Sequence, residues 1–169
     1  MAISMLARLS RGLELINRLF AGVSMVAMLV ACGILTSSVV TRYFFKISTD
    51  WQDEASVFLL VGATFLSGAY VQARRGHIGI GLLAGLLPPR WNRLRQCMCD
   101  LLSLSFCAFF AWKSWTLCLE ALREGQTTDS AWAPPLWIPY VLMSSGMTLL
   151  SLQLALQLAG FGLAESERR

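Results

Sequence analysis

Four long stretches of the chain contain almost no charged side chains. Residues 19–40, 55–73 and 135–161 contain none, and residues 97–119 contain only two. A helix of about 20 apolar residues crosses the ~30 Å hydrocarbon core of a bilayer, so each stretch is long enough to span a membrane. None of them alternates apolar and polar residues as barrel strands do, and a helix satisfies its own backbone hydrogen bonds in lipid. The sequence therefore predicts an all-α integral membrane protein with four transmembrane helices.

We expect these helices to form one domain, residues 1–169. The expected spans are approximately residues 19–41, 54–73, 97–119 and 135–161. A shorter apolar segment, residues 78–87, lies between the second and third spans and is followed by two prolines. This segment is too short to cross a bilayer, so we expect it to lie along the membrane interface.

The composition excludes a water-soluble domain. Hydrophobic residues make up 56% of the 169 residues and charged residues only 14%, whereas soluble domains are about 25% charged. The net charge is +4, but the cations flank the apolar stretches instead of forming one stripe, so we expect no nucleic-acid partner. The five cysteines lie within or at the ends of apolar stretches, which favours small buried residues over a disulfide framework.

The distribution of Lys and Arg predicts the orientation in the membrane. Ten of them lie in the N-terminal tail, the connection between the second and third spans, and the C-terminus, whereas three lie in the other two connections. Cytoplasmic loops carry the excess of Lys and Arg, so both termini are expected in the cytoplasm. The opposite side is acidic, with the side chains Asp50, Asp53, Glu54, Glu120, Glu124 and Asp129.

The connection between the first two spans carries charges of both signs. Arg42 ends the first span, and Asp50, Asp53 and Glu54 follow across a short loop. We expect an ion pair here that ties the two helices together, and it stiffens the hairpin if it is partly removed from water. The alternative is that Arg42 is a simple interfacial charge.

Several residues predict where the helices begin. Thr49 and Gln52 have the spacing of a capping box at the start of the second helix. Pro134 and Pro135 are expected at the start of the fourth helix, where a missing amide proton costs little. The third helix is expected to begin early, near Arg90.

No residue pattern supports catalysis or a cofactor. Residues 79–84 match the glycine spacing of a dinucleotide-binding loop, but they follow an apolar span and not a strand. His77 is the only histidine, so one chain cannot supply the two ligands of a bis-histidine haem. Cys97 and Cys99 have no second pair of metal ligands nearby. We therefore expect no enzymatic activity, no cofactor and no metal.

Polar residues inside the spans are few. Asp100 and Lys113 lie 13 residues apart in the third span, about 20 Å along a helix, so each is placed toward a different interface. Anchoring, contact with a partner helix and an ion pathway all remain open for them. Gln153 and Gln157, one turn apart, can hydrogen-bond a neighbouring helix, and the small residues 144–146 allow close packing.

Five short motifs follow one another along the chain. They are Arg-Tyr-Phe-Phe at 42–45, Trp-Gln-Asp-Glu at 51–54, Thr-Phe-Leu at 64–66, Arg-Arg-Gly-His-Ile-Gly-Ile at 74–80, and Pro-x-Trp at 135–137. Together with the length and the four spans, this set resembles the small membrane subunit, DctQ type, of tripartite ATP-independent periplasmic (TRAP) transporters. In that family an Arg-Tyr pair closes the first helix, a Trp and an acidic pair open the second, and a Gly-His-Ile segment follows it.

The resemblance implies a supporting role in the bacterial inner membrane. In that family a large multi-spanning permease subunit carries the substrate, usually with Na⁺, and a periplasmic solute-binding protein delivers it. The small subunit braces the large one within the lipid and contributes to the docking surface, so the implied function is ion-coupled uptake of an organic acid. The alternative is a self-contained oligomeric four-helix transporter or a membrane assembly factor.

Eight residues are expected to have structural or subunit-interface roles, although lipid contact remains an alternative for those at the cytoplasmic end of the second helix. These residues are Arg42, Trp51, Asp53, Glu54, Arg74, Arg75, His77 and Lys113.

Overall fold

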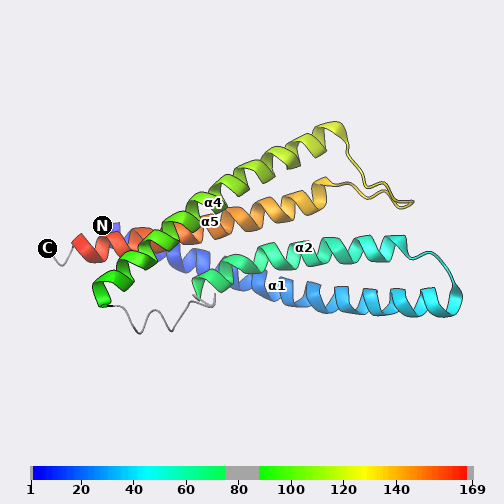
Figure 1. Ribbon diagram of the computed structural model, residues 1–169, viewed down its shortest axis with the longest axis horizontal. Helices are drawn as coiled ribbons and strands as arrows, with labels where there is room; N and C mark the ends of the chain where they lie inside the picture. The colour runs from blue at the N-terminus through cyan, green and yellow to red at the C-terminus, as the bar shows by residue number, and fades with distance from the viewer. Residues whose placement is uncertain (1, 75–87, 167–169) are drawn as a thin grey trace.

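A computed structural model describes residues 2–74 and 88–166, and the side chains of residues 10–74, 88, 91, 92 and 94–160. It contains four long helices (Figure 1), which are α1 (Ala2–Phe45), α2 (Asp50–Ala73), α4 (Pro89–Glu124) and α5 (Trp137–Ser166). Each includes a stretch of at least 24 residues that is long and apolar enough to cross a membrane. The predicted all-α, four-span class is confirmed.

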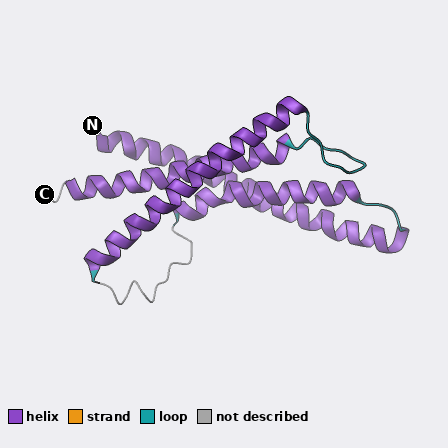
Figure 2. Cartoon of the chain, turned by 45° about the horizontal axis from the view of Figure 1, so that its top comes forward, coloured by secondary structure: helices purple, strands orange, loops and turns teal. Residues whose placement is uncertain are grey.

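The helices form two antiparallel hairpins that pack side by side. One hairpin is α1 with α2, the other is α4 with α5, and the hairpins meet mainly where α2 packs against α5. Figures 1 and 2 show both chain termini at one end of the molecule, which we call the terminal end. The opposite end, where residues 46–49 and 125–136 connect the helices, is the loop end. The two hairpins lie apart at the loop end, and their helices cross nearer the middle of the molecule.

The helix boundaries correct one expectation and confirm another. The α4 helix begins at Pro89, as early as the sequence predicts. The expectation that Pro134 and Pro135 begin the last helix is wrong, because that helix begins at Trp137. The two prolines belong instead to a narrow loop in which Thr128 N–H donates to Pro134 O at 3.1 Å. The expected interfacial segment, residues 78–87, lies outside the described residues.

Large apolar side chains cover much of the outer surface. Leu29 is 74% exposed, Phe106 66% and Trp112 64%. A soluble protein rarely exposes apolar patches of this extent, whereas such side chains are at no disadvantage against lipid tails. The surface therefore agrees with the membrane location that the helix lengths indicate.

Small residues with a seven-residue spacing line the buried side of α4. Cys107, Ser114 and Ala121 are buried seven residues apart, and Ala111 and Cys118 form a second such row. Spacings that alternate between three and four residues keep one narrow seam of a helix against its neighbour. Because the side chains in this seam are small, the backbone of α4 can approach that of α5 closely.

The same spacing occurs on α1. Asn17, Ser24, Ala31 and Ser38 are at most 5% exposed and follow one another at intervals of seven residues. Three of the four are polar, in a helix that must cross a bilayer. Their burial on one line shows that α1 turns these three polar side chains toward the other helices.

The two hairpins come close together where α5 meets α2. A Cβ atom added to Gly146 of α5 would overlap the backbone carbonyl of Phe65 in α2, and one added to Gly62 of α2 would lie 3.1 Å from Leu142 Cδ1. The Phe65 ring also stacks on Phe110 of α4 with the ring centroids 6.3 Å apart. Phe65 therefore lies where α2, α4 and α5 come together.

This contact predicts that Gly146→Ala destabilises the protein. The new methyl group must push α5 away from the Phe65 backbone, which should lower the free energy of unfolding by about 1–3 kcal/mol. The matched control is Gly160→Ala in the same helix, where the added Cβ would meet nothing within 4 Å. Unfolding by SDS titration in mixed micelles measures both variants, and equal stability of the two would contradict this account of the interface.

Candidate functional site

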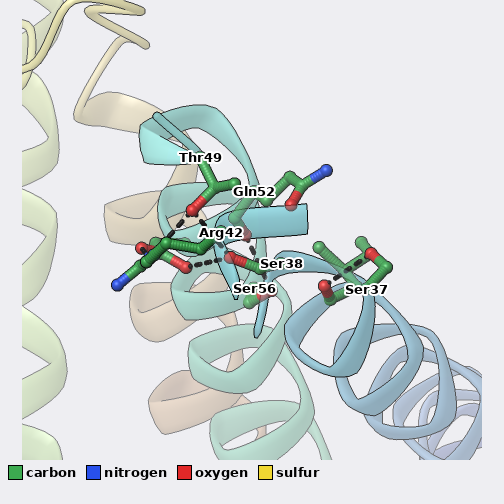
Figure 3. Close-up of polar contacts among 8 residues, drawn as sticks. Ser37, Ser38, Arg42, Thr49, Gln52 and Ser56 are labelled. Atoms are coloured by element: carbon green, nitrogen blue, oxygen red, sulfur yellow. Dashed lines mark hydrogen bonds and ion pairs between the residues drawn. The ribbon is translucent and has the colours of Figure 1, made fainter. Parts of the chain in front are cut away.

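An ion pair joins the ends of α1 and α2 at the loop end. Arg42 Nη2 lies 2.5 Å from Asp53 Oδ2, and the same nitrogen donates to Thr49 Oγ1 at 2.8 Å. The Ser38 hydroxyl lies 2.8 Å from Thr49 Oγ1 and 3.0 Å from Asp53 Oδ1. The ion pair expected for Arg42 is thus formed with Asp53 and lies inside a network of four side chains (Figure 3).

The hydrogen bonds among the four side chains can all form without a conflict between donors. A hydroxyl has one proton to donate, so the arrangement that uses every group has Thr49 donating to Ser38 and Ser38 donating to Asp53. Arg42 then supplies one proton to Thr49 and one to the carboxylate, each of whose oxygens accepts one bond. The network therefore forms a closed ring, and it joins α1 to α2 by one ion pair and by hydrogen bonds of the two hydroxyl groups.

The network lies partly inside the protein. The side chains of Arg42 and Asp53 are 60% and 43% exposed, whereas Ser38 and Thr49 are 1% and 3% exposed. Exposed ion pairs contribute little by themselves. The buried hydroxyls hold the carboxylate and the guanidinium in one geometry, so the hairpin depends on the whole network more than on the pair.

The capping-box expectation for Thr49 and Gln52 is wrong. The backbone oxygen of Thr49 accepts the Gln52 N–H at 3.0 Å and the Asp53 N–H at 3.2 Å, but the Thr49 side chain makes no cap hydrogen bond. Its hydroxyl is engaged by Arg42 and Ser38 instead. Because the Thr49 hydroxyl bonds Arg42 and Ser38 across the hairpin, it does not cap the first turn of α2.

A second set of polar contacts joins three helices nearer the terminal end. Asn17 Nδ2 of α1 donates to Gln153 Oε1 of α5 at 3.1 Å. Gln72 Nε2 of α2 donates to Gln157 Oε1 of α5 at 3.0 Å, and Gln157 Nε2 returns a bond to the Gln72 backbone oxygen at 3.1 Å. The expectation that Gln153 and Gln157 hydrogen-bond neighbouring helices is confirmed.

The other expected site residues do not join the Arg42 network through any hydrogen bond or ion pair among the described residues. Trp51 is exposed at the loop end. The guanidinium of Arg74 lies 5.5 Å from the centre of the Tyr70 ring, beyond the last turn of α2. Arg75 and His77 lie outside the described residues. Glu54 keeps one carboxylate oxygen, Oε2, buried without a hydrogen-bond partner.

Lys113 lies on the exposed side of α4. Its Nζ is 5.2 Å from the centre of the Trp112 ring, which is a cation–π arrangement. The next residue, Ser114, is buried in the α4 seam, so Lys113 points away from it. Within the described part of the chain, no group of three His, Cys, Asp or Glu side chains could hold a metal ion.

Ser38, Asn17 and Gln72 are the three members of these networks that the sequence analysis missed. Ser38 and Asn17 are two of the four residues spaced by seven along α1. A search for small or polar residues at that spacing inside an apolar stretch would have indicated both, because such residues mark the side of a membrane helix that contacts other helices.

The network predicts different effects for two neighbouring serines. Ser38→Ala should lower the free energy of unfolding by about 1 kcal/mol, because the Asp53 carboxylate and the buried Thr49 hydroxyl each lose a bond. The matched control is Ser37→Ala. Ser37 is exposed, lies on another side of α1 and donates only to Ile34 O of its own helix (Figure 3).

The measurement is again unfolding by SDS titration. Ser37→Ala should remain within about 0.5 kcal/mol of the wild-type protein, as most exposed substitutions do. A loss in Ser37→Ala as large as that in Ser38→Ala would show that the hydroxyl network is not what stabilises the hairpin.

The sequence matches a known family over most of its length. Residues 31–161 match the family described as tripartite ATP-independent periplasmic transporters, DctQ component. A relative is the isethionate TRAP transporter permease protein DctMQ of Oleidesulfovibrio alaskensis, which is 26% identical over 110 residues. That match covers 65% of this chain but only 17% of the relative. The chain therefore belongs to the DctQ family, the small permease subunits of TRAP transporters, and is a multi-pass protein of the bacterial inner membrane.

Proposed function

We propose that this subunit braces a large multi-spanning permease and offers its loop end to a periplasmic solute-binding protein, in a system that takes up an organic acid with a coupling ion. The Arg42 network carries this proposal, because it fixes the α1–α2 hairpin at the end that would face the periplasm. The relative's name joins DctM and DctQ in one permease protein, which supports a large partner in the same membrane.

The outer faces of the helices support a partner within the bilayer. A groove of about 690 Å³ runs between α1 and α2 and is lined mainly by small and flexible side chains, among them Ala21, Met25 and Ala63. Ser24 also lines it, and the Ser24 hydroxyl is buried without a hydrogen-bond partner. A helix of the large permease could pack closely in such a groove and supply that missing bond.

The loop between α4 and α5 supports docking of a soluble partner. Its two sides are joined by a bridge between Thr127 and Pro135, and Leu136 N–H donates to Gln126 O at 3.0 Å. Trp132 in this loop is 49% exposed, and Asp129 of the same loop is exposed as well. An ordered loop that presents an aromatic ring and an acid suits a partner surface with a shallow pocket and basic residues.

Charge reversal at this loop tests the proposal. The tagged chain should co-purify with a large permease, and the purified complex should bind the solute-binding protein less tightly as salt rises. Asp129→Lys should weaken that binding about two- to fivefold, the usual range for one charge at the rim of an interface.

The matched control reverses a charge at the other end of the molecule. Glu14→Lys makes the same change at an exposed position on the terminal half of α1 and should leave binding unchanged. Surface plasmon resonance on the immobilised complex measures both variants. Equal affinities for the wild-type protein and Asp129→Lys would show that this loop does not contribute to the docking surface. Failure to recover any large permease would overturn the bracing role.

A further inference from the structure

Two adjoining grooves meet at the Arg42–Asp53 pair. One has a volume of about 470 Å³ and is lined by polar and charged residues of the α1–α2 connection, including Lys46, Thr49 and Asp50. The other has a volume of about 530 Å³ and is lined by Leu35, Val39 and Tyr43 besides Ser38. Arg42 and Asp53 line both grooves. The pair therefore marks the boundary between a charged groove and a mainly apolar one.

The charged groove carries two cations and two carboxylates. Arg42 and Asp53 are paired with each other, and only Nη2 of the guanidinium takes part in that network. Lys46 and Asp50 are exposed, and neither has an ion pair with another described residue. The groove therefore has no net charge, but it offers an unpaired cation and an unpaired carboxylate near the remaining N–H groups of Arg42.

The apolar groove follows one face of α1 away from the loop end. Leu35, Val39 and Tyr43 are spaced by four residues and so lie on one side of the helix, over about 12 Å of its length. Leu35 and Val39 belong to the part of α1 that is apolar enough to cross the membrane. A molecule that fills both grooves must accordingly be polar at one end and apolar at the other.

We propose that the two grooves bind one phospholipid whose headgroup contains both a phosphate and a primary ammonium, as in phosphatidylethanolamine. The phosphate lies against Lys46 and the free N–H groups of Arg42, the ammonium donates to Asp50, and an acyl chain follows Leu35 and Val39. This inference is independent of the proposed transport role, since it requires only the hairpin and a bilayer.

Charge complementarity selects this headgroup over two others. A phosphatidylglycerol headgroup has the phosphate but no cation, so it leaves Asp50 without a partner. A phosphatidylcholine headgroup has a quaternary ammonium, which cannot donate a hydrogen bond to a carboxylate. A zwitterion with N–H donors both pairs with the two unpaired charges of the groove and donates a hydrogen bond to Asp50, which phosphatidylcholine cannot do.

Native mass spectrometry of the full-length protein tests the site. The protein is incubated in detergent with equal concentrations of dioleoyl phosphatidylethanolamine, phosphatidylglycerol and phosphatidylcholine, and the lipid retained is identified by mass. The wild-type protein should retain phosphatidylethanolamine most. Asp50→Asn should lower that retention about fivefold, the effect of losing one charge-assisted hydrogen bond at a partly exposed site, and phosphatidylglycerol should then be retained most.

Two further variants complete the test. Lys46→Gln should lower the retention of both phosphatidylethanolamine and phosphatidylglycerol, because each presents a phosphate. Asp129→Asn removes a carboxylate at the same end of the molecule but outside both grooves, and its lipid profile should match that of the wild-type protein. Circular dichroism confirms that all the variants keep their helical content.

Three results would overturn the proposal. Equal retention of the three lipids by the wild-type protein would show annular lipid only. A wild-type preference for phosphatidylglycerol would show a simple anion site. Identical profiles for Asp50→Asn and Asp129→Asn would show that Asp50 does not contact the headgroup.

Discussion

Close packing of small side chains is the interaction on which the arrangement of these helices depends. Lipid tails are as apolar as the helix surfaces, so burial of apolar area between helices gains little in a bilayer. Helices stay together when their backbones approach closely, as Gly146 of α5 does at the Phe65 carbonyl of α2. The rows spaced by seven residues on α1 and α4 extend the same principle along each hairpin. Larger side chains are left on the outside, where lipid or a partner helix can cover them.

Polar contacts near the two ends of the bundle fix how far each helix is shifted along its neighbours. Packing of small side chains alone does not determine that shift. The Arg42 network fixes α1 against α2 at the loop end. The amide pairs of Gln153 and Gln157 fix α5 against α1 and α2 nearer the terminal end. Between α4 and α5, the small-residue seam lies beside a side-chain bond from Trp115 Nε1 to Thr148 Oγ1 at 3.1 Å. Polar side-chain bonds thus join α1 to α2, α5 to both of them, and α4 to α5.

The sequence predicted the features that depend on one segment at a time. The length of the apolar stretches located the four helices, and the one-turn spacing of Gln153 and Gln157 indicated their contacts. The contact of α2 with α5 could not be predicted from the sequence, because hydropathy does not show which apolar faces of two helices pack together. The capping box at Thr49 failed for a related reason, since its hydroxyl is taken by Arg42 from another helix. The pairing of Arg42 with Asp53, rather than with Asp50 or Glu54, likewise depends on the network around Ser38.

In the proposed function, the Arg42 network braces the hairpin by which this DctQ-family subunit supports its large permease. The most direct measurement is the amount of large permease that co-purifies with each charge variant of the tagged chain. Arg42→Glu should reduce the recovered permease, because a carboxylate then faces Asp53. The double variant Arg42→Glu/Asp53→Arg should restore it, since opposite charges face each other again. Full recovery with Arg42→Glu alone, or no restoration in the double variant, would contradict the claim.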